Sequence, residues 1–291
     1  MKNSRKKNRH RFRTIWKALQ MEQREHRSSF LVYFILRLLV IAVMVLQIFN
    51  RNYENVFLCI LTLLLLIIPS FVQVTMKVEL PTTLEIIILI FIFAAEILGE
   101  ISEFYLVYPF WDMILHTING FLAAAIGFSM VDLLNRSEKL VFQLSPLFTA
   151  IVAFCFSMTI GVIWEFFEFG MDHILGYDMQ KDTVIHTIKS VMLNSEGRNV
   201  PAEIGDITSV VIHGKDLGLG GYLDIGLIDT MKDLMVNFIG AAIFSVIGYI
   251  YVKNRGKGSL VKRFIPSKKK ENRDFLKMIQ TETKNHEEQE K

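Results

Sequence analysis

The chain has 291 residues, of which 52% are hydrophobic and 21% are charged, and its formal net charge is +3. This composition is too apolar for an ordinary soluble domain and excludes an intrinsically disordered chain. The apolar residues form long blocks almost free of charge, and several blocks reach the roughly 20 residues that a helix needs to cross a hydrocarbon core. The sequence therefore predicts an all-α polytopic membrane bundle.

Both ends of the chain are basic. Residues 1–29 hold ten Lys and Arg against two acids, and residues 253–291 hold twelve against six. Basic segments beside apolar helices are typical of cytoplasmic tails near anionic lipid. We predict a basic cytoplasmic segment over 1–29, a transmembrane domain over 30–252 and a basic cytoplasmic tail over 253–291. Nucleic-acid binding is disfavoured because no aromatic nucleic-acid motif accompanies the basic residues.

The N-terminal segment has a helical pattern. Phe12, Ile15, Trp16 and Leu19 recur at helical spacing among basic residues. This pattern predicts a helix that lies on the cytoplasmic membrane surface. We expect no cleavable signal here, because the next apolar run has full spanning length and no small-residue cleavage site.

About six segments reach spanning length in chain order. The predicted helices cover residues 30–49, 56–76, 81–99, 111–134, 146–170 and 226–251. Charge bias supports this count, because the predicted outer connection 100–110 carries no Lys or Arg, whereas the predicted inner loop 135–145 carries Arg136 and Lys139. An even number of crossings returns both ends of the chain to the cytoplasm.

A long outer connection, 171–225, joins the fifth and sixth predicted helices. It carries four bases and eight acids. We expect a short amphipathic helix over 183–193 and a strand over 207–212, followed by the glycine-rich stretch 214–221. A connection of this length above a membrane site is typical of a lid or binding loop.

Polar residues gather toward the outer ends of four predicted helices. Ionisable residues inside a membrane are costly, so each is a candidate functional residue. Spacings of three or four residues place members of each helix on one face, and we expect these faces to meet inside the bundle. The candidates are Glu96, Glu100, Asp112, His116, Asn119, Glu165, Glu168, Asp172, Asp229, Asp233 and Asn237.

Acids far outnumber bases in this zone, where only His116 and Lys232 are basic. Clustered carboxylates in a low dielectric must hold protons or a cation, and carboxylates with one imidazole suit Mg, Mn or Zn. We predict metal ligation by His116, Glu165, Glu168 and Asp233. Catalytic roles are predicted for these four and for Asp112 and Asp229. Supporting roles are predicted for Asn119, Asn237, Glu96, Glu100 and Asp172.

Other residues near this zone have simpler explanations. Trp111, Trp164 and Tyr108 are expected to belong to the aromatic belt at the membrane interface. Gly120 and Gly240 are expected to allow close helix packing. A hydrogen-bonded network with a purely structural role remains an alternative for the acids themselves.

Three ordered motifs carry a resemblance to a known family. They are Trp111-Asp112-x-x-Leu115-His116-x-x-x-Gly120, Trp164-Glu165-x-x-Glu168 and Asp229-Thr230-x-x-Asp233-x-x-x-Asn237-x-x-Gly240-Ala241. Together they resemble the YjdF-like bacterial membrane-spanning proteins over the third to sixth helices. More loosely, their order is similar to that of VanZ-like proteins, which are associated with glycopeptide resistance. The first resemblance implies a site of this kind without naming a reaction.

We therefore expect a multi-pass protein of the bacterial plasma membrane with an outward-facing acidic and histidine site. The favoured function is binding of a divalent cation and action on a phosphate-bearing or lipid-linked envelope molecule. A proton- or cation-coupled transporter and a non-enzymatic envelope or stress-response protein are the alternatives. The sequence leaves open whether the protein is an enzyme. Expected partners are the bilayer, anionic lipid at the basic tails and a lipid-linked or phosphate-bearing ligand.

Overall fold

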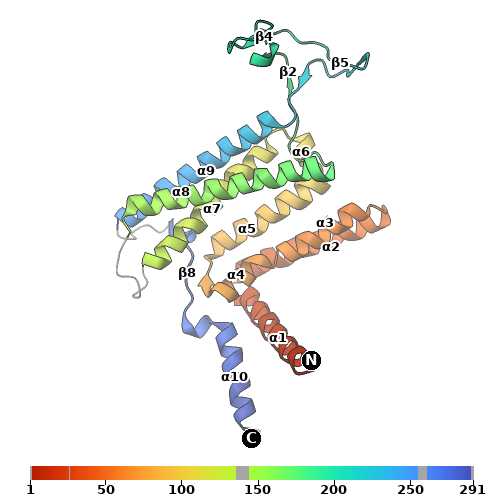
Figure 1. The fold of residues 1–291 in the computed structure, drawn as a ribbon. Coiled ribbons are helices and arrows are strands. Elements are labelled where there is room, and N and C mark those ends of the chain that lie inside the picture. The colour runs from red at the N-terminus through yellow and green to blue at the C-terminus, as the bar shows by residue number, and fades with distance from the viewer. Residues whose placement is uncertain (1, 26, 136–143, 255–260, 290–291) are drawn as a thin grey trace.

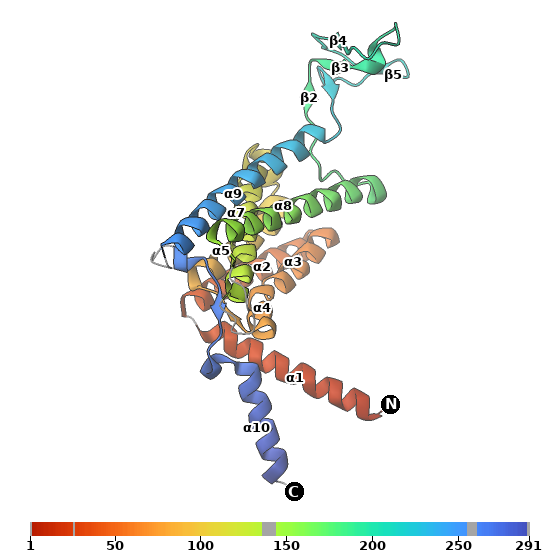
Figure 2. The same cartoon turned by 60° about the vertical axis from the view of Figure 1, so that its left-hand side comes forward.

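The computed structural model of the protein describes residues 2–25, 27–135, 144–254 and 261–289. Long helices dominate the structure and run side by side as a bundle (Figure 1). Both chain termini lie at one end of this bundle, and the segment 176–226 projects from the other (Figures 1 and 2). We call these two ends the chain end and the loop end.

Five helical stretches are long and apolar enough to cross a membrane. They consist of α2 (Arg27–Phe49), α3 (Tyr53–Leu65) with α4 (Ile68–Met76), α7 (Trp111–Asn135), α8 (Pro146–Gly170) with the π-helical η2 (Met171–Leu175), and α9 (Leu227–Lys253). Many large apolar side chains on these helices are exposed, as contact with lipid requires. The predicted polytopic helical bundle is thus present.

The segment predicted as the third spanning helix is less regular than the others. It is α-helical over α5 (Thr82–Phe93) and then π-helical over η1 (Ala94–Ile101). The 12 residues of α5 alone rise about 18 Å, less than a hydrocarbon core of about 30 Å. Together, α5 and η1 lead the chain to α6 (Phe104–Val107), which lies at the loop end (Figure 1).

The second predicted helix, 56–76, is not one continuous α-helix. A turn at Leu66 and Ile67 separates α3 from α4, and Pro69 stands in the first turn of α4. Proline has no N–H to donate to the preceding turn and its ring crowds that turn, which favours a break there.

The loop segment contains short antiparallel strands, and the helix predicted over 183–193 is wrong. Its first residues form strands, and only η3 (Val191–Leu193) is helical, as a 3-10 turn. β-Branched residues such as Val184, Ile185 and Ile188 suit a pleated pair better than an isolated helix. The strand predicted over 207–212 is confined to its last two residues. The pairs are β2 (Val184–Ile185) with β7 (Tyr222–Leu223), β3 (Ile188–Ser190) with β4 (Ala202–Ile204), and β5 (Val211–Ile212) with β6 (Lys215–Asp216).

At the chain end, the N-terminal and C-terminal segments pack on each other. Helix α1 (Lys2–Glu25) is present where a surface helix was predicted, with Trp16 exposed and Leu19 buried. Ala18, Leu19, Val74 and Phe275 form one apolar cluster that joins α1, α4 and α10 (Phe275–Gln289). The strand β8 (Ser267–Lys268), between the 3-10 turns η4 (Val261–Arg263) and η5 (Glu271–Arg273), pairs with β1 (Val78–Glu79). Arg136 and Lys139, used above to orient the chain, lie outside the described residues.

The three helices that carry most predicted site residues share an apolar core on the chain-end side of the site. Ala124 and Phe128 of α7, Ala153 of α8, and Ala241 and Phe244 of α9 are fully buried in one cluster. This packing fills the bundle below the polar residues and fixes the three helices relative to one another.

Candidate functional site

Three glycines allow the site helices to pack closely, two of them against the backbone of the neighbouring helix and one against a side chain. A Cβ atom on Gly120 of α7 would lie 2.2 Å from the carbonyl oxygen of Asn237, and one on Gly240 of α9 would lie 2.1 Å from that of Thr117. A Cβ atom on Gly161 of α8 would meet the Asn237 amide at 2.7 Å. The close packing expected at Gly120 and Gly240 is therefore present, and it draws the polar faces of α7 and α9 together.

Asn237 is the polar link between these helices. It is fully buried, and its Oδ1 accepts a hydrogen bond of 3.4 Å from Asn119 Nδ2. Its own Nδ2 donates to the carbonyl oxygen of Ser157 at 3.5 Å, and Ser157 Oγ donates to that of Gly120 at 2.7 Å. These bonds join α7, α8 and α9 one turn below Asp233, so the two asparagines help to hold the helices that carry the acids.

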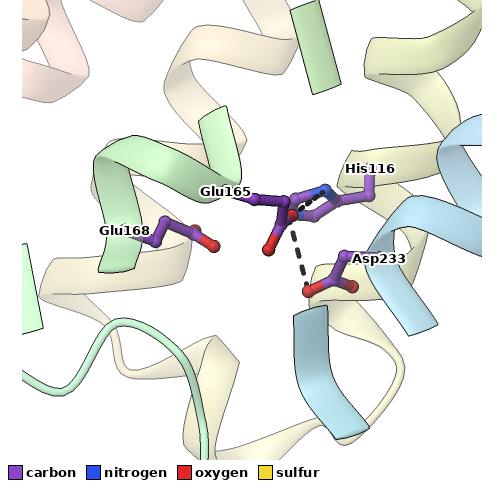
Figure 3. A group of neighbouring side chains, drawn as sticks. All are labelled: His116, Glu165, Glu168 and Asp233. Carbon is purple, nitrogen blue, oxygen red and sulfur yellow. Dashed lines mark ion pairs between the residues drawn. The ribbon is translucent and has the colours of Figure 1, made fainter. Parts of the chain in front are cut away.

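Four buried side chains converge above this link. His116 of α7, Glu165 and Glu168 of α8, and Asp233 of α9 each offer one ligand-type atom, and these atoms lie within 4.8 Å of one another (Figure 3). His116 Nδ1 is 3.9 Å from Glu165 Oε1, and its Nε2 is 3.9 Å from Asp233 Oδ2. These four residues are the set that the sequence predicted as metal ligands, and we call them the buried quartet.

Two acids of the quartet have unsatisfied oxygens. Glu165 is 5% exposed and Asp233 is 1% exposed. Within the described parts of the chain, neither Glu165 oxygen makes a hydrogen bond of normal geometry, and Asp233 Oδ2 makes none either. The side chain of Thr230 lies near Glu165, and that of Asp112 lies near Asp233. A buried carboxylate without a partner is costly, so this arrangement needs protons or a cation for its stability.

A second group of acids lies beside the quartet and shares one member with it. Asp112, Asp229 and Asp233 offer ligand atoms within 4.8 Å of one another. Asp112 and Asp229 are only half-buried, whereas Asp233 is buried. Asp112 Oδ1 is also 3.5 Å from His116 Nε2. Asp233 thus belongs both to the buried quartet and to a second, more exposed group of acids.

The other predicted acids do not join these groups. Among the described residues, neither group includes Glu96, Glu100 or Asp172. Asp172 instead accepts backbone hydrogen bonds from Met179 at 2.6 Å and Gln180 at 2.8 Å, so it shapes the start of the loop segment. Lys232 is exposed beside the buried Asp233 and does not neutralise the site from within.

Several contacts at the site were missed by sequence reasoning. Trp164, predicted as a belt residue, donates a hydrogen bond of 2.8 Å from Nε1 to Glu168 Oε1. Its i,i+4 spacing to Glu168 was a usable signal. The loop also reaches α9, because the Lys181 N–H donates to Asp229 Oδ2 at 2.8 Å and Gln180 Nε2 donates to Thr230 Oγ1 at 2.6 Å.

Tyr105 is a further residue that the sequence did not single out. Its ring covers Gly99, where an added Cβ would lie 2.3 Å from it. Burial raises the pKa of Tyr105 well above its usual range, and the charges of Asp112 and Glu100 raise it further. Tyr105 therefore keeps its proton at neutral pH and offers a neutral O–H donor near the acids.

The donor set of the quartet fits a divalent cation. Three carboxylates and one imidazole are hard to borderline ligands, which suit Mg²⁺, Mn²⁺ or Zn²⁺. Neighbouring ligands of an ion at about 2.1 Å lie about 3.0–3.4 Å apart. The quartet atoms lie within 4.8 Å of one another, so the side chains would move closer together to close on an ion. The unsatisfied oxygens of Glu165 and Asp233 are the atoms that such an ion would satisfy.

Comparison with known proteins places the chain among membrane proteins. Residues 32–254 match the family described as Predicted membrane protein (DUF2238). The chain belongs to this family. No curated protein and no solved structure matches the chain significantly. The DUF2238 match runs from within α2 to the end of α9, so it includes both groups of acids and leaves out all of α1 and all of α10. The YjdF-like and VanZ-like resemblances stay predictions.

Proposed function

We propose that this DUF2238 protein binds a divalent cation through His116, Glu165, Glu168 and Asp233. The single observation that carries the proposal is the set of buried carboxylate oxygens without partners, two on Glu165 and one on Asp233. A cation supplies the missing charge and coordination together, which a packed apolar environment cannot do.

We further propose that the ion serves the binding or conversion of a phosphate-bearing or lipid-linked envelope molecule. Bare acids repel phosphate, whereas a bound divalent ion attracts its oxygens and polarises the phosphorus centre. The site lies next to the loop segment, whose residues Gln180 and Lys181 hydrogen-bond to Thr230 and Asp229 in the first turn of α9. In this reading the basic tails are cytoplasmic, the loop segment lies outside the plasma membrane, and the substrate arrives from that side.

Coupled transport is supported less well. A transporter needs an ionisable path that continues toward the other face of the membrane. On the chain-end side of the quartet, the space between α7, α8 and α9 is packed with Ala124, Phe128 and Phe244. A purely structural network is also disfavoured, because such a network would satisfy its buried oxygens.

The proposal is tested by measuring bound divalent metal in the purified full chain. Wild-type protein is expected to retain Mn²⁺, Zn²⁺ or Mg²⁺ after desalting, and Asp233→Asn is expected to lose most of it. Glu203→Gln is the matched control, because this exposed acid of the loop segment pairs only with Lys189 at 2.8 Å among the described residues. Equal metal content in wild type and Asp233→Asn, or none in wild type after incubation with each ion, would overturn the proposal.

A further inference from the structure

We infer that the site holds two divalent cations bridged by Asp233, and that the second ion presents open coordination positions to a phosphate group. This inference rests on the proposed function and extends it to a second ion. Its starting observation is the arrangement of the two acid groups, which share one residue and only one.

Asp233 has the position of a bridging ligand. It is 1% exposed, its Oδ2 lies 3.9 Å from His116 Nε2, and that oxygen has no hydrogen-bond partner in the described chain. Asp233 also belongs to the group formed with Asp112 and Asp229. A carboxylate has two oxygens, so one can serve each ion, as in two-metal sites where the ions lie about 3.5–4 Å apart.

The charge of the site supports two ions rather than one. Glu165, Glu168, Asp112, Asp229 and Asp233 are five acids, and His116 is the only basic residue in the two groups. One divalent ion would leave a large excess of negative charge among the ionised acids, whereas two nearly balance it. The charges of Lys181 and Lys232 act on Asp229 from outside the two groups, and the Lys181 ammonium also contacts Asp178 at 3.9 Å.

The two positions differ in how completely the protein surrounds them. The buried quartet supplies four protein ligands, which is the number of a closed site. The second position has three protein ligands, and two of these, Asp112 and Asp229, are half-buried. An ion with three protein ligands keeps positions for water or substrate. The second ion would therefore be the one that meets the ligand.

The surroundings of the second position favour a ligand that enters from the loop end. Asp229 Oδ2 already accepts the Lys181 N–H, which leaves its other oxygen to face the ion. Gln180 and Lys181 pack against the start of α9, where a Cβ atom on Gly226 would come within 2.7 Å of Gln180. Non-bridging oxygens of a phosphate monoester or diester are ligands that a pair of such ions recognises.

The test uses Mn²⁺ with the full-length protein in detergent. Wild type is expected to bind two Mn²⁺ per chain and to give the spectrum of an exchange-coupled pair by electron paramagnetic resonance. Asp229→Asn and, independently, Asp112→Asn are expected to bind one Mn²⁺ and to give a six-line mononuclear spectrum. Asparagine keeps the oxygen that can accept the Lys181 N–H, and a helical far-UV circular dichroism spectrum equal to wild type confirms the fold of each variant.

The outcomes separate this inference from the proposed function. One Mn²⁺ per chain in wild type, with a mononuclear spectrum, would overturn the second ion and leave the first intact. No Mn²⁺ in wild type would overturn the inference, and the proposed function would fail with it only if Zn²⁺ and Mg²⁺ were not retained either. Inorganic phosphate is the probe for the ligand class: it should perturb the coupled spectrum of wild type, and it should bind the Asp229→Asn protein at least tenfold more weakly. Equal phosphate affinity in both proteins would overturn the assignment of the second ion to the ligand.

Discussion

Buried acids have basic partners at the chain end of the bundle, whereas several of their oxygens lack hydrogen-bond partners at the loop end. At the chain end, the buried Glu22 of α1 forms an ion pair with the buried Lys269, and Arg273 pairs with both Glu25 and Glu79. Lys77 lies 3.3 Å from Asp274 in the same region. At the loop end, the acids of the quartet are as deeply buried, yet three of the four carboxylate oxygens of Glu165 and Asp233 have no hydrogen-bond partner in the described chain.

This difference separates a structural network from a site that needs a ligand. Burial raises the pKa of Glu22, and the hydrogen bond and charge of Lys269 oppose that rise. The C-terminal segment thus brings its own counter-charge to α1 and to the turn between α4 and α5, and this network is complete within the chain. Among the described residues, the imidazole of His116 is the one base within 4 Å of the acids at the loop end, so their balance depends on something added from solution.

The largest expected effect tests the completeness of the chain-end network. Lys269→Met leaves Glu22 buried without its partner, and we expect a loss of about 3–5 kcal/mol in the docking of the C-terminal segment. Hydrogen exchange of α10 and of strand β8 measures this loss. The double variant Glu22→Gln/Lys269→Met should recover most of the protection, because neutral side chains replace the whole pair. Unchanged exchange in Lys269→Met would mean that the pair does not hold the segment.

The second prediction is that replacing a buried acid at the loop end, unlike breaking the buried pair at the chain end, does not lower stability. Asp233→Asn removes one of the clustered buried acids, so metal-free protein should not lose thermal stability. Wild type, by contrast, should gain about 2.7 kcal/mol when Mn²⁺ is present at 100 times its dissociation constant, and Asp233→Asn should gain nothing. Melting temperatures with and without Mn²⁺ measure both. Lys269→Met should keep the Mn²⁺ shift, and its loss there would contradict the independence of the two ends.

A third, smaller effect addresses the packing that positions the loop-end acids. Gly240→Ala places a methyl group 2.1 Å from the Thr117 carbonyl oxygen, so α9 must move away from α7. We expect a cost of about 1–3 kcal/mol and weaker Mn²⁺ binding, with unchanged hydrogen exchange at the chain end. Gly170→Ala is the matched control, because nothing lies within 4 Å of a Cβ added at this helical glycine. Equal Mn²⁺ affinity in the two alanine variants would show that close packing does not set the site.

The sequence predicts much of the loop end because the constraints there are local. Apolar length places the spanning helices, and spacings of three or four residues predict that Glu165 and Glu168 share a face. The cost of charge in a membrane then predicts that such faces turn inward. These rules bring His116 and Asp233 to the same place, and the structure agrees. Their role as metal ligands stays a prediction.

The sequence predicts less where the outcome depends on contacts between distant segments. Helical spacing predicts which helix face carries Glu96 and which carries Asp172. It does not predict how each helix is rotated or how deep it lies in the bundle, and these decide that both residues lie outside the two acid groups. The pair of Glu22 and Lys269 joins residues 247 positions apart, so no local sequence pattern predicts it. The β-branched residues after Thr183 fit either a short helix or a strand by pattern alone, and pairing with residues 202–204 and 222–223 decides for strands.

The smallest expected effect is that of an exposed ion pair, which serves as a reference for the buried pair at the chain end. Lys189 and Glu203 form an exposed ion pair of 2.8 Å between β3 and β4. Water screens this exposed pair, so a double-mutant cycle with Lys189→Ala and Glu203→Gln should give a coupling of about 0.2–1 kcal/mol in thermal unfolding. Neither change should alter Mn²⁺ binding. A coupling as large as that of Glu22 with Lys269 would show that burial is not what distinguishes the chain-end pair, and the contrast between the two ends would then need another cause.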